Sequence, residues 1–235
     1  WQYQQAFRAP WPMQTLSSEV RWQQQKAGDW WLWSDKLDVV TKDVALQGWF
    51  SLHIPLQGSP MLSASAHADV LRAEQAYRYF PEPLMGSALV DYLQGAIRGG
   101  QAQGAKVMWY GALDAFPYQD NQGIFQAKVP LRDAQFRFDP DWQPLSALDL
   151  DLLFENDNLY MKGEEGLLGS VTASQIKAQI VPLDEDANLE LSAHIQGEGE
   201  AVTSYLQSSA LADSVGITLE QLQVTGPLSG QLALT

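Results

Sequence analysis

The chain has 235 residues, of which 46% are hydrophobic and 18% are charged; its 14 lysines and arginines against 28 aspartates and glutamates give a formal net charge of −14. This apolar content predicts a folded chain with a sizeable core. Because an acidic surface repels a phosphate backbone, nucleic acid is excluded as a partner. The absence of cysteine excludes disulfides, thiolate metal sites and thiol nucleophiles.

The beginning of the chain is rich in tryptophan. Seven of the nine tryptophans lie in the first 49 residues, and Trp30, Trp31 and Trp33 stand close together. Indoles serve in cores, at interfaces and in ligand sites, so they predict either one tightly packed end of a sheet or a ligand lining. Since the chain begins at Trp1 in place of a methionine and ends at Thr235 within an alternating run, we expect a fragment of a longer protein.

Most of the chain has the period of two that is typical of β-strands. Apolar residues share one face, and polar residues the other, most clearly at 46–54, 125–131, 148–154, 176–180 and 189–195. Turn-forming asparagine, aspartate, glycine and proline residues separate these runs at short intervals. The pattern predicts roughly a dozen strands joined as sequential antiparallel hairpins, each with one apolar and one wet face.

One amphipathic helix is predicted over 87–98, where apolar residues recur three and four positions apart. Ser87 is expected to cap its start, and Gly99-Gly100 to end it in a turn. Two short helices are predicted at 73–79 and 201–207. The fold class is therefore mainly β, a sheet with one clear helix and one or two short helices packed on it.

The polar residues form no catalytic or metal-binding pattern. Three histidines are scattered along the chain, and Asp184–Asn188 opens like a calcium loop but lacks the later glycine and glutamate, which favours a polar turn. Asp149 and Asp151 alternate with leucines, so the wet face of a strand explains them better than a pair of catalytic carboxylates. We predict no enzymatic activity, no metal and no cofactor.

From Leu84 onward, several short motifs resemble one known family in their order and spacing. The motifs are Leu84-Met85-Gly86-Ser87-Ala88-Leu89, Ala96-Ile97-Arg98-Gly99-Gly100, Val107-Met108-Trp109-Tyr110-Gly111, Phe116-Pro117-Tyr118, Asn121-Gln122-Gly123-Ile124-Phe125, Phe136-Arg137-Phe138-Asp139-Pro140-Asp141-Trp142 and Leu148-Asp149-Leu150-Asp151-Leu152-Leu153-Phe154. They resemble the YhdP type of the AsmA-like superfamily. We accordingly divide the chain into preceding Trp-rich strands at 1–83 and a YhdP-like unit at 84–235 that continues beyond the fragment.

The resemblance implies a long envelope protein of Gram-negative bacteria, anchored in the inner membrane by a helix outside this sequence and extending through the periplasm. Family members resemble bridge-like lipid-transfer proteins, in which repeating sheet units bend into a taco-shaped groove. Such a groove carries phospholipid between the inner and outer membranes and serves outer-membrane biogenesis. The fragment is expected to be monomeric, periplasmic and in contact with membranes only through parts missing from it.

Our first hypothesis is a groove segment that holds phospholipid acyl chains, because each methylene buried against an apolar face contributes about 0.8 kcal/mol. The expected lining positions are Phe125, Val129, Phe136, Phe138, Leu148, Leu150, Leu152, Phe154, Ile176, Ile180, Leu189, Leu191 and Ile195. The sequence leaves open whether each lines a groove or fills a core beneath the helix. The alternative is a periplasmic scaffold that holds no lipid and binds proteins through an exposed sheet edge.

Overall fold

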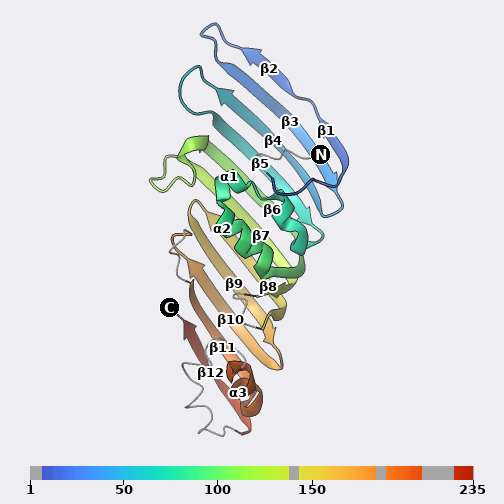
Figure 1. Cartoon of the computed structure of the whole chain (residues 1–235), viewed down its shortest axis with the longest axis vertical. Helices are drawn as coiled ribbons and strands as arrows, with labels where there is room; N and C mark the ends of the chain where they lie inside the picture. Colours follow the sequence, from blue (N-terminus) through green and yellow to red (C-terminus); the bar gives the residue numbers. More distant parts are fainter. Residues whose placement is uncertain (1–6, 138–142, 184–188, 208–224, 235) are drawn as a thin grey trace.

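The computed structural model describes residues 7–137, 143–183, 189–207 and 225–234. They form one antiparallel sheet of twelve strands in the order β1-β3-β4-β5-β6-β7-β8-β9-β10-β11-β12, with β2 beside β1 on the same edge of β3 (Figure 1). The strands are β1 (Met13–Ser18), β2 (Arg21–Gln24), β3 (Trp30–Thr41), β4 (Val44–Ile54), β5 (Met61–Val70), β6 (Ile97–Ala112), β7 (Ile124–Phe136), β8 (Leu145–Glu155), β9 (Asn158–Leu168), β10 (Val171–Ile180), β11 (Leu189–Glu198) and β12 (Pro227–Leu234). The predicted fold class is confirmed.

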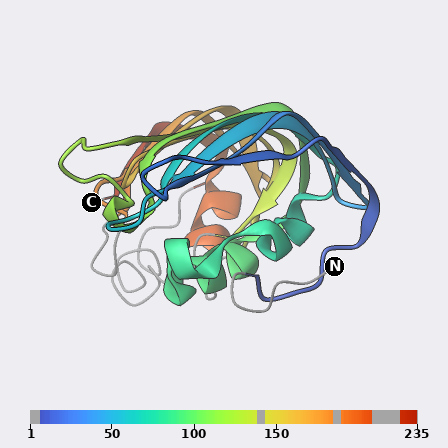
Figure 2. The same ribbon diagram turned by 90° about the horizontal axis from the view of Figure 1, so that it is seen from above.

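The sheet is bent into an arch (Figure 2). Irregular positions interrupt the pairing register in several strands, and Asp133, Ala147 and Gln175 have φ values of 48°, 47° and 52°. Such bulges insert an extra residue on one strand, which increases the local twist and bends the strand. Repeated from strand to strand, they curl an open sheet into a trough.

The α-helices lie in connections that begin at the same edge of the sheet. Between β5 and β6 lie a 3₁₀ helix, η1 (Ala73–Tyr79), and two α-helices, α1 (Glu82–Met85) and α2 (Ser87–Ala96), while α3 (Gly199–Gln207) follows β11. We call this edge of the arch, where β5 ends and β6 begins, the helical rim. The opposite edge, where β6 ends and β7 begins, is the loop rim and carries η2 (Leu113–Ala115). Figure 2 shows the α-helices beneath the arch, on its concave side.

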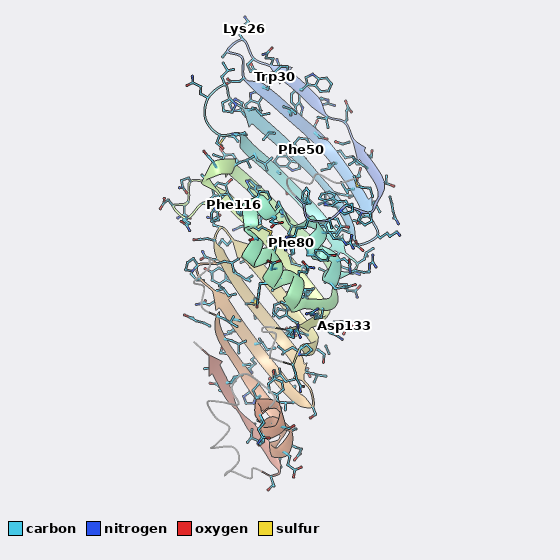
Figure 3. The ribbon with its side chains drawn as sticks, viewed as in Figure 1. Lys26, Trp30, Phe50, Phe80, Phe116 and Asp133 are labelled. Carbon is cyan, nitrogen blue, oxygen red and sulfur yellow. The ribbon has the colours of Figure 1, made fainter. Side chains whose placement is uncertain are left out.

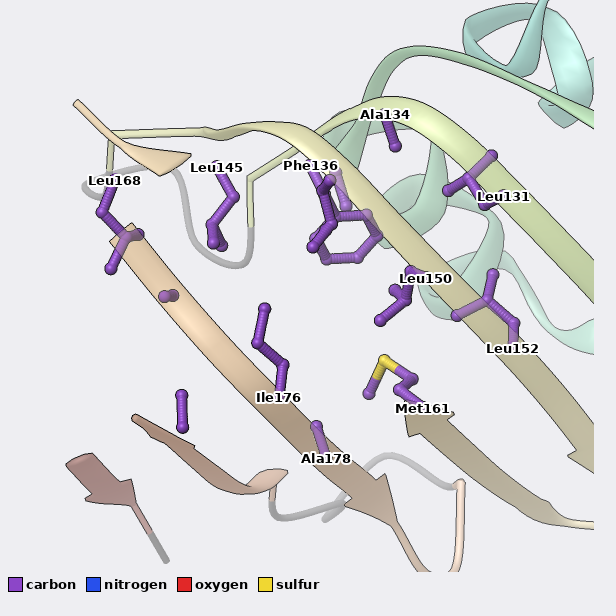
Figure 4. Packing of buried hydrophobic residues seen from close by; sticks show 14 of the residues in the cluster. Leu131, Ala134, Phe136, Leu145, Leu150, Leu152, Met161, Leu168, Ile176 and Ala178 are labelled. Atoms are coloured by element: carbon purple, nitrogen blue, oxygen red, sulfur yellow. The ribbon is translucent and has the colours of Figure 1, made fainter. Parts of the chain in front are cut away.

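The main hydrophobic cluster lies on this concave side (Figure 4). Leu150, Met161 and Ile176 project from neighbouring strands toward a common centre, and Ala96 of α2 joins the same cluster. Its buried members are Ala73, Ala96, Leu131, Ala134, Phe136, Leu145, Leu148, Leu150, Leu152, Leu159, Met161, Leu168, Val171, Ala173, Ile176, Ala178, Ile180 and Ala193. The predicted apolar phases thus share one face.

The predicted helix at 87–98 exists and begins at Ser87, but its predicted N-cap and its predicted end were wrong. Gly86 is the N-cap, Ser87 already lies inside α2, and the helix ends at Ala96, after which the chain enters β6. Gly100 is not a helix stop but a strand residue with φ +118°, where a Cβ atom would lie 2.9 Å from the Cα of Ala134. The same freedom that suits glycine to a helix end suits it to a bulge with close backbone contact.

Both short helices are confirmed, at η1 and at α3. The division of the chain at residue 83 stays a prediction, and β5 and β6 on either side of it pair directly in one sheet. The predicted turn at 184–188 and the position Phe138 lie outside the described residues.

Candidate functional site

Continuous rows of apolar residues cross the concave face. Paired residues on neighbouring antiparallel strands point to the same face, so the pairing register traces each face across the sheet. One row on the helix-covered side crosses nine strands as Leu37, Gly48, Ala66, Val107, Ala127, Phe154, Leu159, Ile180 and Leu189. A parallel row continues as Val129, Leu152, Met161, Ala178 and Leu191. We call this concave apolar surface the trough.

The neighbouring row on the outer face is mostly polar. It reads Asp38, Gln47, His67, Lys106, Lys128, Leu153, Tyr160, Gln179 and Glu190. On this face Arg132 donates a 2.8 Å hydrogen bond to Asp151, and the backbone N–H of Asp133 donates one of 3.0 Å to Asp149. Because Asp149 and Asp151 both accept hydrogen bonds from β7 on the outer face, the interpretation of these aspartates as part of a wet strand face is supported.

The trough differs in exposure between its two halves. In the C-terminal half, Leu148, Leu150 and Ile176 are only 1%, 2% and 4% exposed. In the N-terminal half, trough residues such as Phe50 and Leu52 are half-buried. The trough is therefore a packed core at the centre of β8 to β10, whereas its residues on β4 and β11, such as Leu52 and Leu191, are only half-buried and stay accessible from the concave side.

A box of aromatic side chains stands on the loop rim. Tyr118 is fully buried and accepts a 2.7 Å hydrogen bond from Nε1 of Trp109, whose ring stacks on Phe116 with a centroid distance of 4.8 Å (Figure 3 labels Phe116). Cβ atoms at Gly111 and Gly123 would lie 2.6 Å and 2.5 Å from the Tyr118 ring. The two glycines thus leave room for the Tyr118 ring close to the backbone. Burial raises the pKa of Tyr118, although the hydrogen bond from Trp109 opposes this.

The turn that follows is fixed by asparagines. Asn121 adopts φ +59°, and its backbone N–H donates to the carbonyl of Tyr118 over 2.9 Å. Asn156 donates to the same carbonyl and accepts a 2.9 Å hydrogen bond from the backbone N–H of Phe125. The Trp-Tyr-Gly, Phe-Pro-Tyr and Asn-Gln-Gly motifs are therefore parts of one packing unit on the rim.

Comparison with known proteins assigns the family. The model of the family described as YhdP protein matches residues 1–235. The chain belongs to the YhdP family. The intermembrane phospholipid transporter YhdP of Escherichia coli (strain K12) is 40% identical over 232 residues, which cover 99% of this chain and 18% of that protein. This YhdP-family chain thus spans about a fifth of the length of its curated relative. No solved structure matches it significantly.

Twelve of the thirteen expected lining positions of this YhdP-family chain lie in the described residues. Buried in the C-terminal trough are Phe136, Leu148, Leu150, Leu152, Ile176 and Ile180. Half-buried are Phe125, Val129, Phe154, Leu189, Leu191 and Ile195. The sequence-based list omitted the accessible positions on β4 and β5, including Phe50, Leu52 and Leu62, although the same alternation marks them in the sequence.

The tryptophans of this YhdP-family chain have mixed environments. Trp11 packs on Tyr79 with ring centroids 5.3 Å apart, as expected for an indole that packs the sheet end. Trp22, Trp30 and Trp49 are instead 67%, 41% and 45% exposed, so that interpretation is wrong for these three. Trp22 and Trp30 lie on the trough-facing phase near the loop rim, and Trp49 lies on the outer face.

Within the residues that the structure describes, none of the helices is long and apolar enough to cross a membrane. In the same residues, no three histidine or acidic side chains converge as a metal site would require.

Proposed function

We propose that this chain is a groove segment of an intermembrane phospholipid carrier and that lipid acyl chains lie in its trough. The observation that carries the proposal is the nine-strand apolar row from Leu37 to Leu189, which contains no polar side chain. The curated relative, named as an intermembrane phospholipid transporter, supports the same conclusion and does not favour a lipid-free scaffold.

The continuity of the row supplies a mechanism for lipid movement. Neighbouring strands are about 4.8 Å apart, so an acyl chain laid across them meets an apolar side chain on every strand. A polar group in the row would have to be desolvated each time a methylene passed it, at a cost of about 1–3 kcal/mol. A row without such groups gives the acyl chain similar contacts at each step along the sheet, while the headgroup stays in water at the open mouth.

The thirteen expected lining positions stand as part of this proposal, together with Phe50, Leu52 and Leu62 in the accessible half. Moving a lipid breaks no covalent bond, so the proposed activity requires no catalytic residue and no cofactor. We place the segment, as a monomer, in the periplasm of a Gram-negative cell, where regions outside this sequence contact the inner and outer membranes.

The test combines lipid extraction with site-specific cross-linking. The full chain is purified from Gram-negative cells, extracted with organic solvent and analysed for phospholipid by mass spectrometry. A photo-crosslinking amino acid is placed at Leu191 in the trough and, as a matched control, at Glu190, its neighbour on the outer face. We expect phospholipid in the extract and lipid adducts at Leu191 but not at Glu190.

Repeated failure to recover phospholipid or adducts from folded protein would contradict the proposal and favour the alternative of a scaffold that holds no lipid. Equal adducts at Leu191 and Glu190 would also contradict it, because they would indicate nonspecific contact with lipid. Circular dichroism of each variant reports whether the sheet is intact.

A further inference from the structure

The hairpin formed by α1 and α2, residues 82–96, is built as a flap over the trough. Two connections, which we call its legs, join it to the helical rim. The first leg is η1, which follows β5, and the second is the end of α2, which leads directly into β6. Figures 1 and 2 show its tip, at α1, reaching across the concave side toward the loop rim. Val90, Leu93 and Ala96 of α2 are buried, and α2 packs on η1 and β6.

The legs of the flap are firmly attached. On the first leg, the buried carboxylate of Asp43 accepts hydrogen bonds from Arg72 and, over 3.1 Å, from the hydroxyl of Tyr79. On the second leg, the carbonyl of Ala96 accepts a 2.8 Å hydrogen bond from the backbone N–H of Arg137 at the end of β7. The side chain of Arg72 is 49% exposed, but the carboxylate of Asp43 is only 1% exposed and accepts two hydrogen bonds, and the second leg is held by a backbone bond, so both legs are attached to the sheet.

The tip, in contrast, is contacted near the surface by the cation Arg8. Arg8 donates two hydrogen bonds to Glu82 of α1, over 2.7 Å and 2.9 Å, and others to Asp91 and to the carbonyl of Ser87 in α2. The side chains of Arg8 and Glu82 are 23% and 33% exposed and that of Asp91 is 66% exposed, so water reaches all three groups and competes most strongly for the contact with Asp91. Between the two helices Gly86 has φ +80° and open space around it, which permits a change of backbone direction.

Arg8 reaches the tip from the far edge of the sheet. It lies five residues before β1, and β3, β4 and β5 separate β1 from β6. Trp11 fixes this N-terminal segment by donating a 3.0 Å hydrogen bond from Nε1 to the carbonyl of Arg78. The segment from Arg8 to Trp11 therefore connects the edge of the sheet to the tip of the flap.

The legs of the flap are attached at the helical rim, its tip is contacted at the surface by Arg8, and the aromatic box stands on the opposite rim at β6 and β7. We propose that α1 and α2 form a flap that opens about the helical rim to let phospholipid pass along the trough, and that Arg8 is its latch. This inference rests on the proposed function and adds to it a regulated step at β6.

The first test removes the latch. In Arg8→Gln we expect amide hydrogen exchange in residues 82–96 to accelerate about fivefold, because the ionic contacts to Glu82 and Asp91 are lost. Arg21→Gln is the matched control, since Arg21 pairs with Glu19 and Asp35 away from the flap. Asp91→Asn provides a second latch variant in case Arg8→Gln fails to fold. Unchanged exchange in folded latch variants would overturn the assignment of Arg8.

The second test locks the flap. Since the chain has no cysteine, Arg8→Cys with Asp91→Cys can be joined selectively by a short bis-maleimide. Phospholipid vesicles are supplied, and photo-adducts are measured at Val107 on β6, the strand that α2 packs on, and at Leu52 in the N-terminal trough. We expect Val107 adducts to rise in Arg8→Gln and to fall about fivefold when locked, with Leu52 unchanged.

The two proposals fail in different ways. If lipid adducts form at Leu52 and the adduct yield at Val107 changes neither on removal of the latch nor on locking, the flap proposal is wrong and the proposal of a lipid-binding trough is retained. The absence of adducts at Leu52 and Val107 in the unlocked protein would overturn the proposed function, and the flap with it.

Discussion

The two halves of the trough share one pattern and differ in what covers it. On β8 to β10, trough residues such as Leu150 and Ile176 are almost fully buried and pack with Ala96 of α2 in one cluster. On β4 and β5, Phe50, Leu52 and Leu62 occupy the same face and remain half-buried. An apolar face alone therefore does not identify a ligand surface, because the same alternation builds a core in one half and an accessible surface in the other.

The largest effect that separates the halves is the cost of truncating a trough leucine. Leu150→Ala in the packed half is expected to lower the free energy of unfolding by about 2–5 kcal/mol, because it leaves a cavity among buried neighbours. Leu52→Ala is expected to cost only about 1 kcal/mol, since its side chain keeps contact with solvent. Urea unfolding of both variants measures the difference, and equal losses would break the comparison.

The aromatic box marks the level at which the halves meet, and it is expected to tolerate no added methyl group. Gly123→Ala would place a Cβ atom 2.5 Å from the Tyr118 ring and should destabilise the fold by about 1–3 kcal/mol. Gly95→Ala in α2 is the matched control, because nothing lies within 4 Å of that position. Helix propensity should make the control more stable by about 0.5–1 kcal/mol, and thermal unfolding would reveal opposite signs.

A smaller effect is expected from the hydrogen bond within the box. Tyr118→Phe removes the acceptor of the Trp109 indole N–H and should cost about 1 kcal/mol without changing the ring packing. Chemical unfolding gives the magnitude, and the near-ultraviolet circular dichroism of the aromatic rings should stay nearly unchanged. A lost aromatic signal would show that the hydroxyl orients the whole box.

The smallest expected effect is the pH dependence of the flap. The hydrogen bonds from Arg8 lower the pKa of Glu82 below its ordinary value of 4.5. The stabilisation is therefore complete above pH 4.5 and is lost as the pH falls through the lowered pKa of the folded state. The ratio of exchange rates in residues 82–96 between Arg8→Gln and the wild-type chain should be largest near neutral pH and approach one in acid. A ratio independent of pH would contradict this account of the latch.

Much of the sheet could be predicted from the sequence, because a period of two assigns each strand residue to a face. The alternation of leucines with Asp149 and Asp151 correctly predicted the trough phase and the outer phase of β8. The end of α2 could not be predicted, because the pair Gly99-Gly100 is equally typical of a helix end and of the bulge that β6 contains.

The candidate site was predicted only in part for a related reason. A period of two reports the direction of a side chain but not the layer above it, so buried Leu150 and accessible Leu52 have the same signature. The box depends on a loop that brings Tyr118 back onto Gly111 and Gly123, a contact between three separate motifs. The latch depends on Arg8 meeting Glu82, 74 positions later in the chain, for which the sequence has no local signal.

The most direct test of the lipid trough is the period of lipid cross-linking along a single strand. A photo-crosslinking amino acid is placed in turn at 46–54 on β4, and the phospholipid adduct at each position is measured with vesicles present. The account predicts adducts at Leu46, Phe50, Leu52 and Ile54, which share the trough phase, and few at Gln47, Trp49, Ser51 and His53 on the outer face. Adducts without this alternation, or strongest at exposed Trp49, would contradict a lipid-bearing trough.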